Sequence, residues 1–445
     1  MTRSKFRKLV LPVAGLALLA GCARDDESIK TLTGPQYAPA LFTRYVSLGN
    51  SITSGYQASG ISGATQAQAY PVLLAQAANA PFTYPVLAGR GCAPPLAGPF
   101  LYTAARLGTT GVADPTATAA TCDLRSSAFP RFVQNLAVPG AKIDDALTNF
   151  AIGTSANALT TFFLGGRSQV QAMVALQPSL VSVFLGNNDA LGAAVAGDTA
   201  QLTSLPAFQQ RVDSLVAALK TVPAGQGGND HDVVLIGIAP FPAIVQPGAY
   251  AFVSRDAAGN LGGKAVSADC APGTPGGSNL VSLAILGSAL PAISCADNAP
   301  YVLNATERTT FFSRIDAYNA ALSKAASDNG WIYINTNAVL GGAGTLAGTL
   351  RAKLSPTQFR LCQGLATAAT PAAIQAAVLT TCPSPTLVSG AIPPYTVGSA
   401  AYANFFGTWL TFDAVHPSLP FHKLLTNAMI DAINTKHGTT IPNIS

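Results

Sequence analysis

Short apolar runs alternate with longer amphipathic stretches along most of the chain. Buried parallel strands are typically continuous apolar runs of about four to eight residues, whereas helices that cover a sheet repeat their apolar residues with helical periodicity. The sequence predicts strands at residues 44–48, 180–185, 232–238 and 331–334. It predicts helices at residues 69–78, 169–176, 208–222, 309–329 and 420–436. This alternation indicates an α/β fold, with a parallel sheet covered by helices on both faces.

Four segments rich in Gly, Pro, Ala and Thr interrupt the alternation, at roughly 88–130, 152–167, 245–300 and 338–405. We interpret them as long loop insertions that decorate one core rather than as separate domains, which predicts a single domain over residues 42–440. Hydrophobic residues make up 49% of the chain and charged residues only 10%. That composition supplies a large core and excludes disorder for the bulk of the chain.

The N-terminus has the layout of an export signal, with a basic stretch followed by an apolar run from Leu9 to Ala20. A run of about a dozen residues is too short to span a bilayer, which takes about 20. The small residues before Cys22 resemble a bacterial lipobox, in which the signal is cut before the cysteine and the thiol is lipidated. The alternative is an ordinary secretory signal followed by an accidental cysteine. We expect a signal peptide over residues 1–21, a tether over 22–41 and an exported protein anchored by a lipid on Cys22.

The formal net charge of +5 falls to near neutrality without the signal, which leaves 21 basic and 20 acidic residues. A nearly neutral chain lacks the positive surface by which proteins bind nucleic acid, so that class of partner is excluded. Asp25 and Asp26 lie three and four positions after Cys22 rather than immediately after it. We therefore expect the protein to be located on the outer membrane or cell surface rather than on the inner membrane. We also expect it to be a monomer.

Export changes the interpretation of the six remaining cysteines, because an oxidising compartment favours disulfides. The sequence alone allows fifteen pairings of six cysteines. The spacing suggests pairs that are neighbours in sequence, each closing one Gly/Pro-rich segment: Cys92 with Cys122, Cys270 with Cys295, and Cys362 with Cys382. The rival interpretation is metal binding, but no pair has the short spacing of a zinc site. We expect disulfides and no metal.

Candidate chemistry lies near the two ends of the predicted domain. Ser51 follows Gly49 and Asn50 directly after the first predicted strand, where a sharp strand-to-helix turn leaves a hydroxyl exposed. A serine needs a base to act as a nucleophile, and imidazole has a suitable pKa. Of the four histidines, only His416 has a carboxylate, Asp413, three residues upstream in a loop before a helix. Such a carboxylate can bind Nδ1 and orient the ring.

Two further stretches offer hydrogen-bond donors to a developing oxyanion. The turn at residues 135–141 contains Gly140, whose backbone N–H is available to a ligand. The stretch Gly186-Asn187-Asn188-Asp189, after the second predicted strand, offers side-chain amides. Either stretch alone is also compatible with an ordinary Gly/Asn loop.

Together these four blocks resemble the SGNH, or GDSL-type, serine hydrolase family, which carries such blocks in this order. The matching positions are Ser51, Gly140, Asn188 and the pair Asp413 and His416. The resemblance covers residues 44–417 and implies a three-layer α/β/α fold with a flavodoxin-like parallel sheet. It implies ester hydrolysis through an acyl-enzyme on Ser51, with His416 as base, Asp413 as its orienter and no cofactor. The oxyanion would bind the Ser51 and Gly140 N–H groups and the Asn188 side chain.

The sequence departs from the family pattern at Asn50, where the family has Asp, and at Ile52, where it has Leu. We expect this to affect the rate rather than the class of reaction, since that Asp is not the triad acid. The expected substrate is a lipid, glycan or polymer ester. One alternative is a carbohydrate O-acetyl esterase with the same triad, which would release acetate and no longer acyl chain. The other is a non-catalytic surface lipoprotein that uses the fold for binding.

Overall fold

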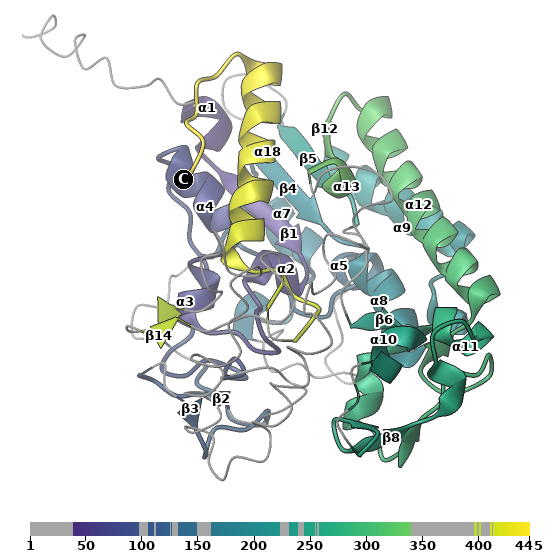
Figure 1. Ribbon diagram of the computed structural model, residues 1–445. Coiled ribbons are helices and arrows are strands. Elements are labelled where there is room, and N and C mark those ends of the chain that lie inside the picture. Colours follow the sequence, from purple (N-terminus) through teal and green to yellow (C-terminus); the bar gives the residue numbers. More distant parts are fainter. Residues whose placement is uncertain are drawn as a thin grey trace, which may run out of the picture.

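The structure is a computed structural model (Figure 1). The description covers residues 39–97, 106–110, 113–124, 126, 132–148, 162–222, 231–238, 244–253, 255, 258–339, 396–397, 400–401, 410–411 and 413–445. The predicted signal peptide and tether, including Cys22, lie outside the described residues except for the last residues before position 42.

A parallel sheet forms the centre of the molecule, with the strand order β1-β4-β5-β12. Its strands are all apolar or nearly so: β1 (Tyr45–Gly49), β4 (Leu180–Phe184), β5 (Asp232–Ile236) and β12 (Ile332–Ile334). Every residue of β1, β4 and β5 is buried, as expected when both faces of a parallel sheet are covered. The four strands predicted from the sequence are confirmed, with ends that differ by one or two residues.

Helices pack on the sheet in two groups (Figure 1). The helices α4 (Tyr70–Ala77) and α18 (Leu419–His437) contact each other, and α18 also contacts β12. The second group contains α5 (Ile143–Leu147), α7 (Gln169–Leu176), α9 (Leu205–Lys220) and α12 (Ala305–Asp328), of which α12 contacts β5 and β12 and α7 contacts β1. The predicted α/β fold with helices around a parallel sheet is therefore confirmed.

Capping residues explain where these helices begin. Asn304 accepts hydrogen bonds from the N–H groups of Thr306 and Glu307, and Glu307 accepts one in return from the N–H of Asn304. This capping box starts α12 four residues before the predicted start. Ser204 likewise caps α9 three residues before its predicted start. Apolar periodicity locates the middle of a helix, whereas polar caps fix its first residue.

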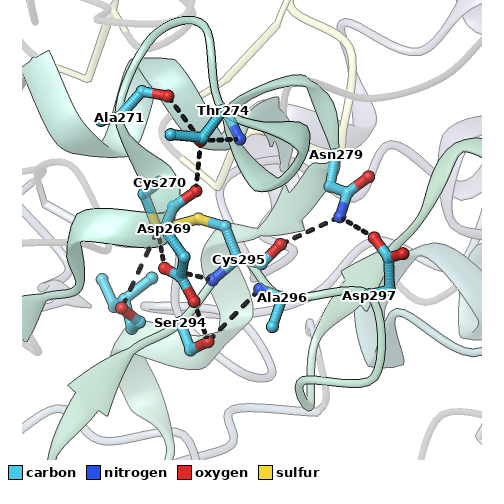
Figure 2. Close-up of a disulfide and its surroundings, with 11 residues drawn as sticks. Asp269, Cys270, Ala271, Thr274, Asn279, Ser294, Cys295, Ala296 and Asp297 are labelled. Carbon is cyan, nitrogen blue, oxygen red and sulfur yellow. Dashed lines mark hydrogen bonds between the residues drawn. A yellow bond between two sulfur atoms is a disulfide. The ribbon is translucent and has the colours of Figure 1, made fainter.

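The predicted insertion at 245–300 contains regular structure, which the sequence analysis did not anticipate. Two small sheets form there: β6 (Val245–Pro247), β9 (Leu280–Ser282) and β11 (Val302–Leu303) in one, and β7 (Asn260–Leu261), β8 (Lys264–Val266) and β10 (Ala292–Ile293) in the other. The Cys270–Cys295 disulfide joins the segments that follow β8 and β10, and Asp269 accepts hydrogen bonds from the Ser294 hydroxyl and the Cys295 N–H (Figure 2). Short helices complete this region: α10 (Gly248–Val253), α11 (Pro275–Ser278), η2 (Ala268–Cys270) and η3 (Leu283–Gly287).

The Cys92–Cys122 disulfide closes the first insertion, which contains β2 (Arg106–Leu107) and β3 (Ala113–Asp114). Two of the three predicted disulfides are thus confirmed, while Cys362 and Cys382 lie outside the described residues.

Within the described ranges, no helix combines the length and the apolarity needed to cross a bilayer. The remaining short elements are α1 (Pro39–Phe42), α2 (Ser51–Ser54), α3 (Gly63–Gln66), α8 (Asn187–Ala196), η1 (Thr199–Gln201), α13 (Thr336–Val339), β13 (Thr396–Val397) and β14 (Ala400–Ala401).

Candidate active site

Ser51 occupies the tight turn predicted for it, at the carboxyl end of β1. It is the first residue of α2, and the side chain of Asn50 caps that helix by accepting the N–H of Ile52 at 3.0 Å. Asn50 therefore keeps one function that an Asp at this position would serve. A side chain at position 49 would place its Cβ 2.0 Å from Oγ1 of Thr53, so Gly49 is required for the close turn. As the first residue of the helix, Ser51 has no intrahelical acceptor for its own N–H.

Asp413 and His416 form the predicted pair. Nδ1 of His416 lies 2.6 Å from Oδ2 of Asp413, and the backbone N–H groups of Val415 and His416 donate to Oδ1, each at 2.9 Å. Ala414 adopts a positive φ of 61° to bring these groups together. Ile244 donates its N–H to the carbonyl oxygen of Ala414 at 3.1 Å, which connects the loop to the start of the insertion at 245–300.

The Asp413 carboxylate also receives hydrogen bonds from the segment that follows α2. The N–H of Ser59 donates to Oδ2 at 2.6 Å, and the Thr411 hydroxyl donates to Oδ1 at 3.1 Å. Burial alone would raise the pKa of Asp413, but the His416 ring and the backbone N–H groups of His416 and Val415 outweigh it and lower the pKa to about 2. The carboxylate is therefore ionised at every pH at which the protein is expected to act.

Ala58 and Ser59 adopt an uncommon backbone conformation to reach this loop. Their φ angles are 47° and 53°, in the left-handed region that residues with a side chain rarely occupy. Each such residue costs about 1–3 kcal/mol and persists only where the surroundings hold it. Here the N–H of Ala58 donates to the Thr411 hydroxyl at 2.9 Å, beside the bond from Ser59 to Asp413. Two successive N–H groups thus point at the loop that carries the acid.

The two predicted oxyanion donors lie beside the serine turn. Gly140 has a φ of 86°, and a Cβ placed there would meet no described atom within 4 Å, so the backbone at this position borders open space. Asn188, in the first turn of α8, donates one amide hydrogen of its side chain to the carbonyl oxygen of Ala141 at 2.9 Å. That bond fixes the amide and leaves its second hydrogen for a ligand.

These residues line one cavity of about 500 Å³, which contains Ser51, Gly140, Asn188 and His416 on its wall. Tyr56 is also on the wall, with its ring 4.8 Å from that of His416 between centroids. Burial raises the pKa of Tyr56 to about 12, so its hydroxyl stays protonated. Among the hydrogen bonds of the described residues, none joins Ser51 to His416; such bonds are often long in enzymes without substrate and shorten when it binds.

Two of the other histidines lie on α18 and have partners within the fold. His422 is fully buried in α18, where its Nδ1 accepts the N–H of Tyr70 at 3.2 Å. Burial and the nearby His416 lower the pKa of His422 to about 3, so it packs as a neutral ring. His437, at the end of the same helix, lies 2.6 Å from the Asp232 carboxylate.

Asp269, Cys270 and Cys295 form the group of potential metal ligands within the described part of the chain. The two sulfur atoms are joined in a disulfide and are not thiolates, so this group does not have the chemistry of a metal site.

The sequence analysis missed the residues that support the acid. Ala58, Ser59 and Thr411 carry no recognisable signal, because the requirement is for backbone N–H groups at one place in space. Gln169 was also missed: its side chain accepts the N–H of Gly49 and donates to the carbonyl oxygen of Gly49, at 2.8 and 2.9 Å. A buried glutamine at the start of a predicted helix was the only available sign.

Solved structures with a similar arrangement include several lipases. A putative GDSL-like lipase from Parabacteroides merdae is 12% identical, covers 88% of this chain and 95% of its own, and has a TM-score of 0.33. An extracellular lipase from Streptomyces rimosus is 18% identical over 71% and 89%, with a TM-score of 0.27. Phospholipase A1 from Streptomyces albidoflavus is 16% identical over 88% and 98%, with a TM-score of 0.29. At these values the likeness carries no weight for the function, and no curated protein matches the chain.

The match to a protein family, unlike the likeness to these solved structures, bears on the function. Residues 45–429 match the family described as GDSL-like Lipase/Acylhydrolase, which takes in the serine turn, both oxyanion candidates and the Asp413–His416 pair. The match covers most of the chain and agrees with the parallel sheet and with the residues around the cavity. The chain therefore belongs to the GDSL-like lipase/acylhydrolase family and is a carboxylic ester hydrolase.

Proposed function

We propose that the protein hydrolyses esters through an acyl-enzyme on Ser51, with His416 as the base and Asp413 as its orienter. The observation that carries this proposal is the bond of 2.6 Å between His416 and Asp413, on the wall of the cavity that also contains Ser51. A carboxylate on Nδ1 places the hydrogen there and leaves Nε2 free to accept a proton.

The reaction follows from these positions. Ser51 Oγ attacks the ester carbonyl carbon while Nε2 of His416 takes the hydroxyl proton. The resulting oxyanion accepts hydrogen bonds from the N–H groups of Ser51 and Gly140 and from the Asn188 side chain. Cleavage of the carbon–oxygen bond releases the alcohol, which leaves with the proton from His416. Water, deprotonated by the same ring, then attacks the acyl-enzyme and releases the carboxylic acid and the free Ser51 hydroxyl.

Labelling with a fluorophosphonate probe tests the nucleophile. We expect the probe to modify the wild-type protein and the Ser54→Ala variant but not Ser51→Ala. Ser54 is a suitable control because it lies in the same short helix, buried like Ser51, and donates a hydrogen bond to the carbonyl oxygen of Ser51. Absence of labelling in folded wild-type protein would favour the non-catalytic binding lipoprotein instead.

The cavity volume favours a substrate larger than an acetyl ester of a small alcohol. Acyl esters of p-nitrophenol with increasing chain length measure this directly. Hydrolysis that extends to acyl chains longer than acetyl supports a lipid or polymer ester. Release of acetate alone, and from acetylated polysaccharide, would support the carbohydrate O-acetyl esterase.

We also propose that the chain is exported and anchored by a lipid on Cys22, on the outer membrane or cell surface. Two disulfides support an oxidising compartment, although they do not bear on the anchor itself. Metabolic labelling with a radioactive fatty acid tests the anchor: the wild-type chain should incorporate label and Cys22→Ser should not. Label in the inner-membrane fraction alone would contradict the proposed location.

A further inference from the structure

The disulfide-bonded first insertion forms part of the cavity wall. Cys92, Ala93, Ala119, Ala120 and Cys122 all line the cavity that contains Ser51 and His416. Among the described lining residues, this part of the wall carries only alanine side chains and a disulfide, with no charged group. Ala119 and Ala120 are exposed, so their side chains border the cavity without being packed in a core. The wall is therefore apolar, and its side chains are small.

Backbone hydrogen bonds hold this wall in register with the segment after α2. The N–H of Cys92 donates to the carbonyl oxygen of Ile61, and the N–H of Ile61 donates to that of Ala93, both at 2.8 Å. A Cβ on Gly91 would lie 1.9 Å from the carbonyl oxygen of Ile61, so the two backbones approach as closely as glycine allows. The wall has little freedom to move away from this segment.

Arg106 adds a second fastening from within the insertion. Its guanidinium donates to the carbonyl oxygens of Ser59 and Pro94, at 2.7 and 2.6 Å. Ser59 is the residue whose N–H binds Asp413. A continuous path of hydrogen bonds therefore runs from the wall through Ser59 to Asp413 and His416.

Because this path holds the wall beside His416, it indicates which part of a bound ester the wall faces. In the proposed reaction, His416 returns its proton to the leaving alcohol, so the alcohol portion lies on the His416 side of Ser51. The oxyanion donors Gly140 and Asn188 lie on other elements, the turn after residue 135 and the first turn of α8. The hydrogen bonds described above tie the wall to the His416 side, through Ser59 and Asp413.

We propose that Cys92, Ala93, Ala119, Ala120 and Cys122 form the binding wall for an apolar alcohol portion of the ester, and that the three alanines set how bulky that alcohol can be. This inference rests on the proposed function, because it assumes that Ser51 and His416 carry out the reaction. A larger side chain at position 119 or 120 shortens the space for the alcohol and leaves the acyl side unchanged.

Two series of esters test the wall. In the first, butyrate is esterified with methanol, butanol or octanol; in the second, p-nitrophenol is esterified with acyl chains of increasing length. For Ala119→Leu and Ala120→Leu, we expect kcat/KM for the octyl ester to fall about tenfold relative to the methyl ester, the lower end of the effect of one methylene group in an apolar pocket. The order of preference within the acyl series should not change. Ala265→Leu, an exposed alanine on β8, is the matched control and should leave both series unchanged.

The outcomes separate the wall from the mechanism. An equal loss for the methyl, butyl and octyl esters, or a changed order of preference within the acyl series, would overturn the assignment of the wall to the alcohol. Fluorophosphonate labelling of each variant at the wild-type rate shows that Ser51 and His416 are intact. If wild-type protein hydrolysed no ester in either series, the proposed function would fall first and this inference with it.

Discussion

The backbone N–H of Ser59 donates a hydrogen bond of 2.6 Å to Oδ2 of Asp413, although 354 positions separate the two residues in the chain. The same oxygen binds Nδ1 of His416. Asp413 is thus positioned from two directions, by its own loop and by a turn that follows the serine. The geometry of the candidate triad depends on both, and each half can be tested separately.

Replacement of Asp413 by Asn removes the charge that orients His416. The N–H group of the Asn side chain can donate a hydrogen bond to Nδ1 of His416. The ring hydrogen then lies on Nε2, which can no longer accept a proton from Ser51. By analogy with the serine protease triad, we expect kcat to fall by about 10³–10⁴ with little change in KM. Steady-state kinetics with a p-nitrophenyl ester measure this. A variant that kept more than a tenth of wild-type kcat would contradict the role of Asp413.

Two substitutions at Ser59 separate its backbone conformation from its side chain. Ser59→Gly keeps the N–H and accepts the positive φ, so stability and kcat should stay near wild type. Ser59→Val places a β-branched side chain at a φ of 53° and should lower the free energy of unfolding by about 1–3 kcal/mol. Urea denaturation compares them. Equal stability of the two variants would show that the turn stores no strain.

Asp413 also links stability to pH. Its pKa is about 2 in the folded protein against an ordinary value of 3.8, so the folded state holds its proton less tightly than the unfolded state. The resulting stabilisation is present above about pH 4 and is lost as the pH falls from 4 towards 2, on the order of 2 kcal/mol in all. The free energy of unfolding of the wild-type protein should therefore decrease more steeply over that range than that of Asp413→Asn. Parallel curves would rule this out.

Asn188→Ala tests the oxyanion donors. Loss of one such donor typically lowers kcat by about 10²–10³. We expect that effect in kcat with KM nearly unchanged, since the hydrogen bond strengthens only as charge develops on the oxygen. Asn187→Ala is the control, because the neighbouring asparagine does not line the cavity among the described residues. Similar losses in the two variants would point to disruption of α8 rather than to a missing donor.

The Cys270–Cys295 disulfide is expected to matter for stability rather than for catalysis. Both sulfur atoms are buried, and the bridge closes a loop of 25 residues that contains α11, β9 and β10. Replacing both cysteines by Ala should lower the free energy of unfolding by about 3 kcal/mol. At 25 °C the rate of ester hydrolysis should be preserved, because the cavity lining contains neither residue. A selective loss of kcat without loss of stability would refute this assignment.

The sequence predicts the central sheet and the middle of each main helix, and the cysteine spacing suggests the two disulfides that the structure contains. Short apolar runs such as Leu180–Phe184 are typical of buried strands, and the periodic stretch at 169–176 matches its helix to the residue. The sequence also placed Ser51, Gly140, Asn188, Asp413 and His416 as candidates, because each lies in a short local pattern at the end of an element. What such patterns report is local backbone and side-chain preference.

Only the tertiary structure decided how these residues are held together. The backbone N–H groups of Ala58 and Ser59 donate hydrogen bonds to Thr411 and Asp413, which lie more than 350 positions away in the chain. Almost every residue type has a backbone N–H, so the sequence does not show which N–H groups will be used in this way. The same holds for the cavity wall at Cys92 and Ala93, whose importance comes from its register with Ile61. Alanine and serine are common everywhere, so their meaning here comes from the contacts that the fold gives them.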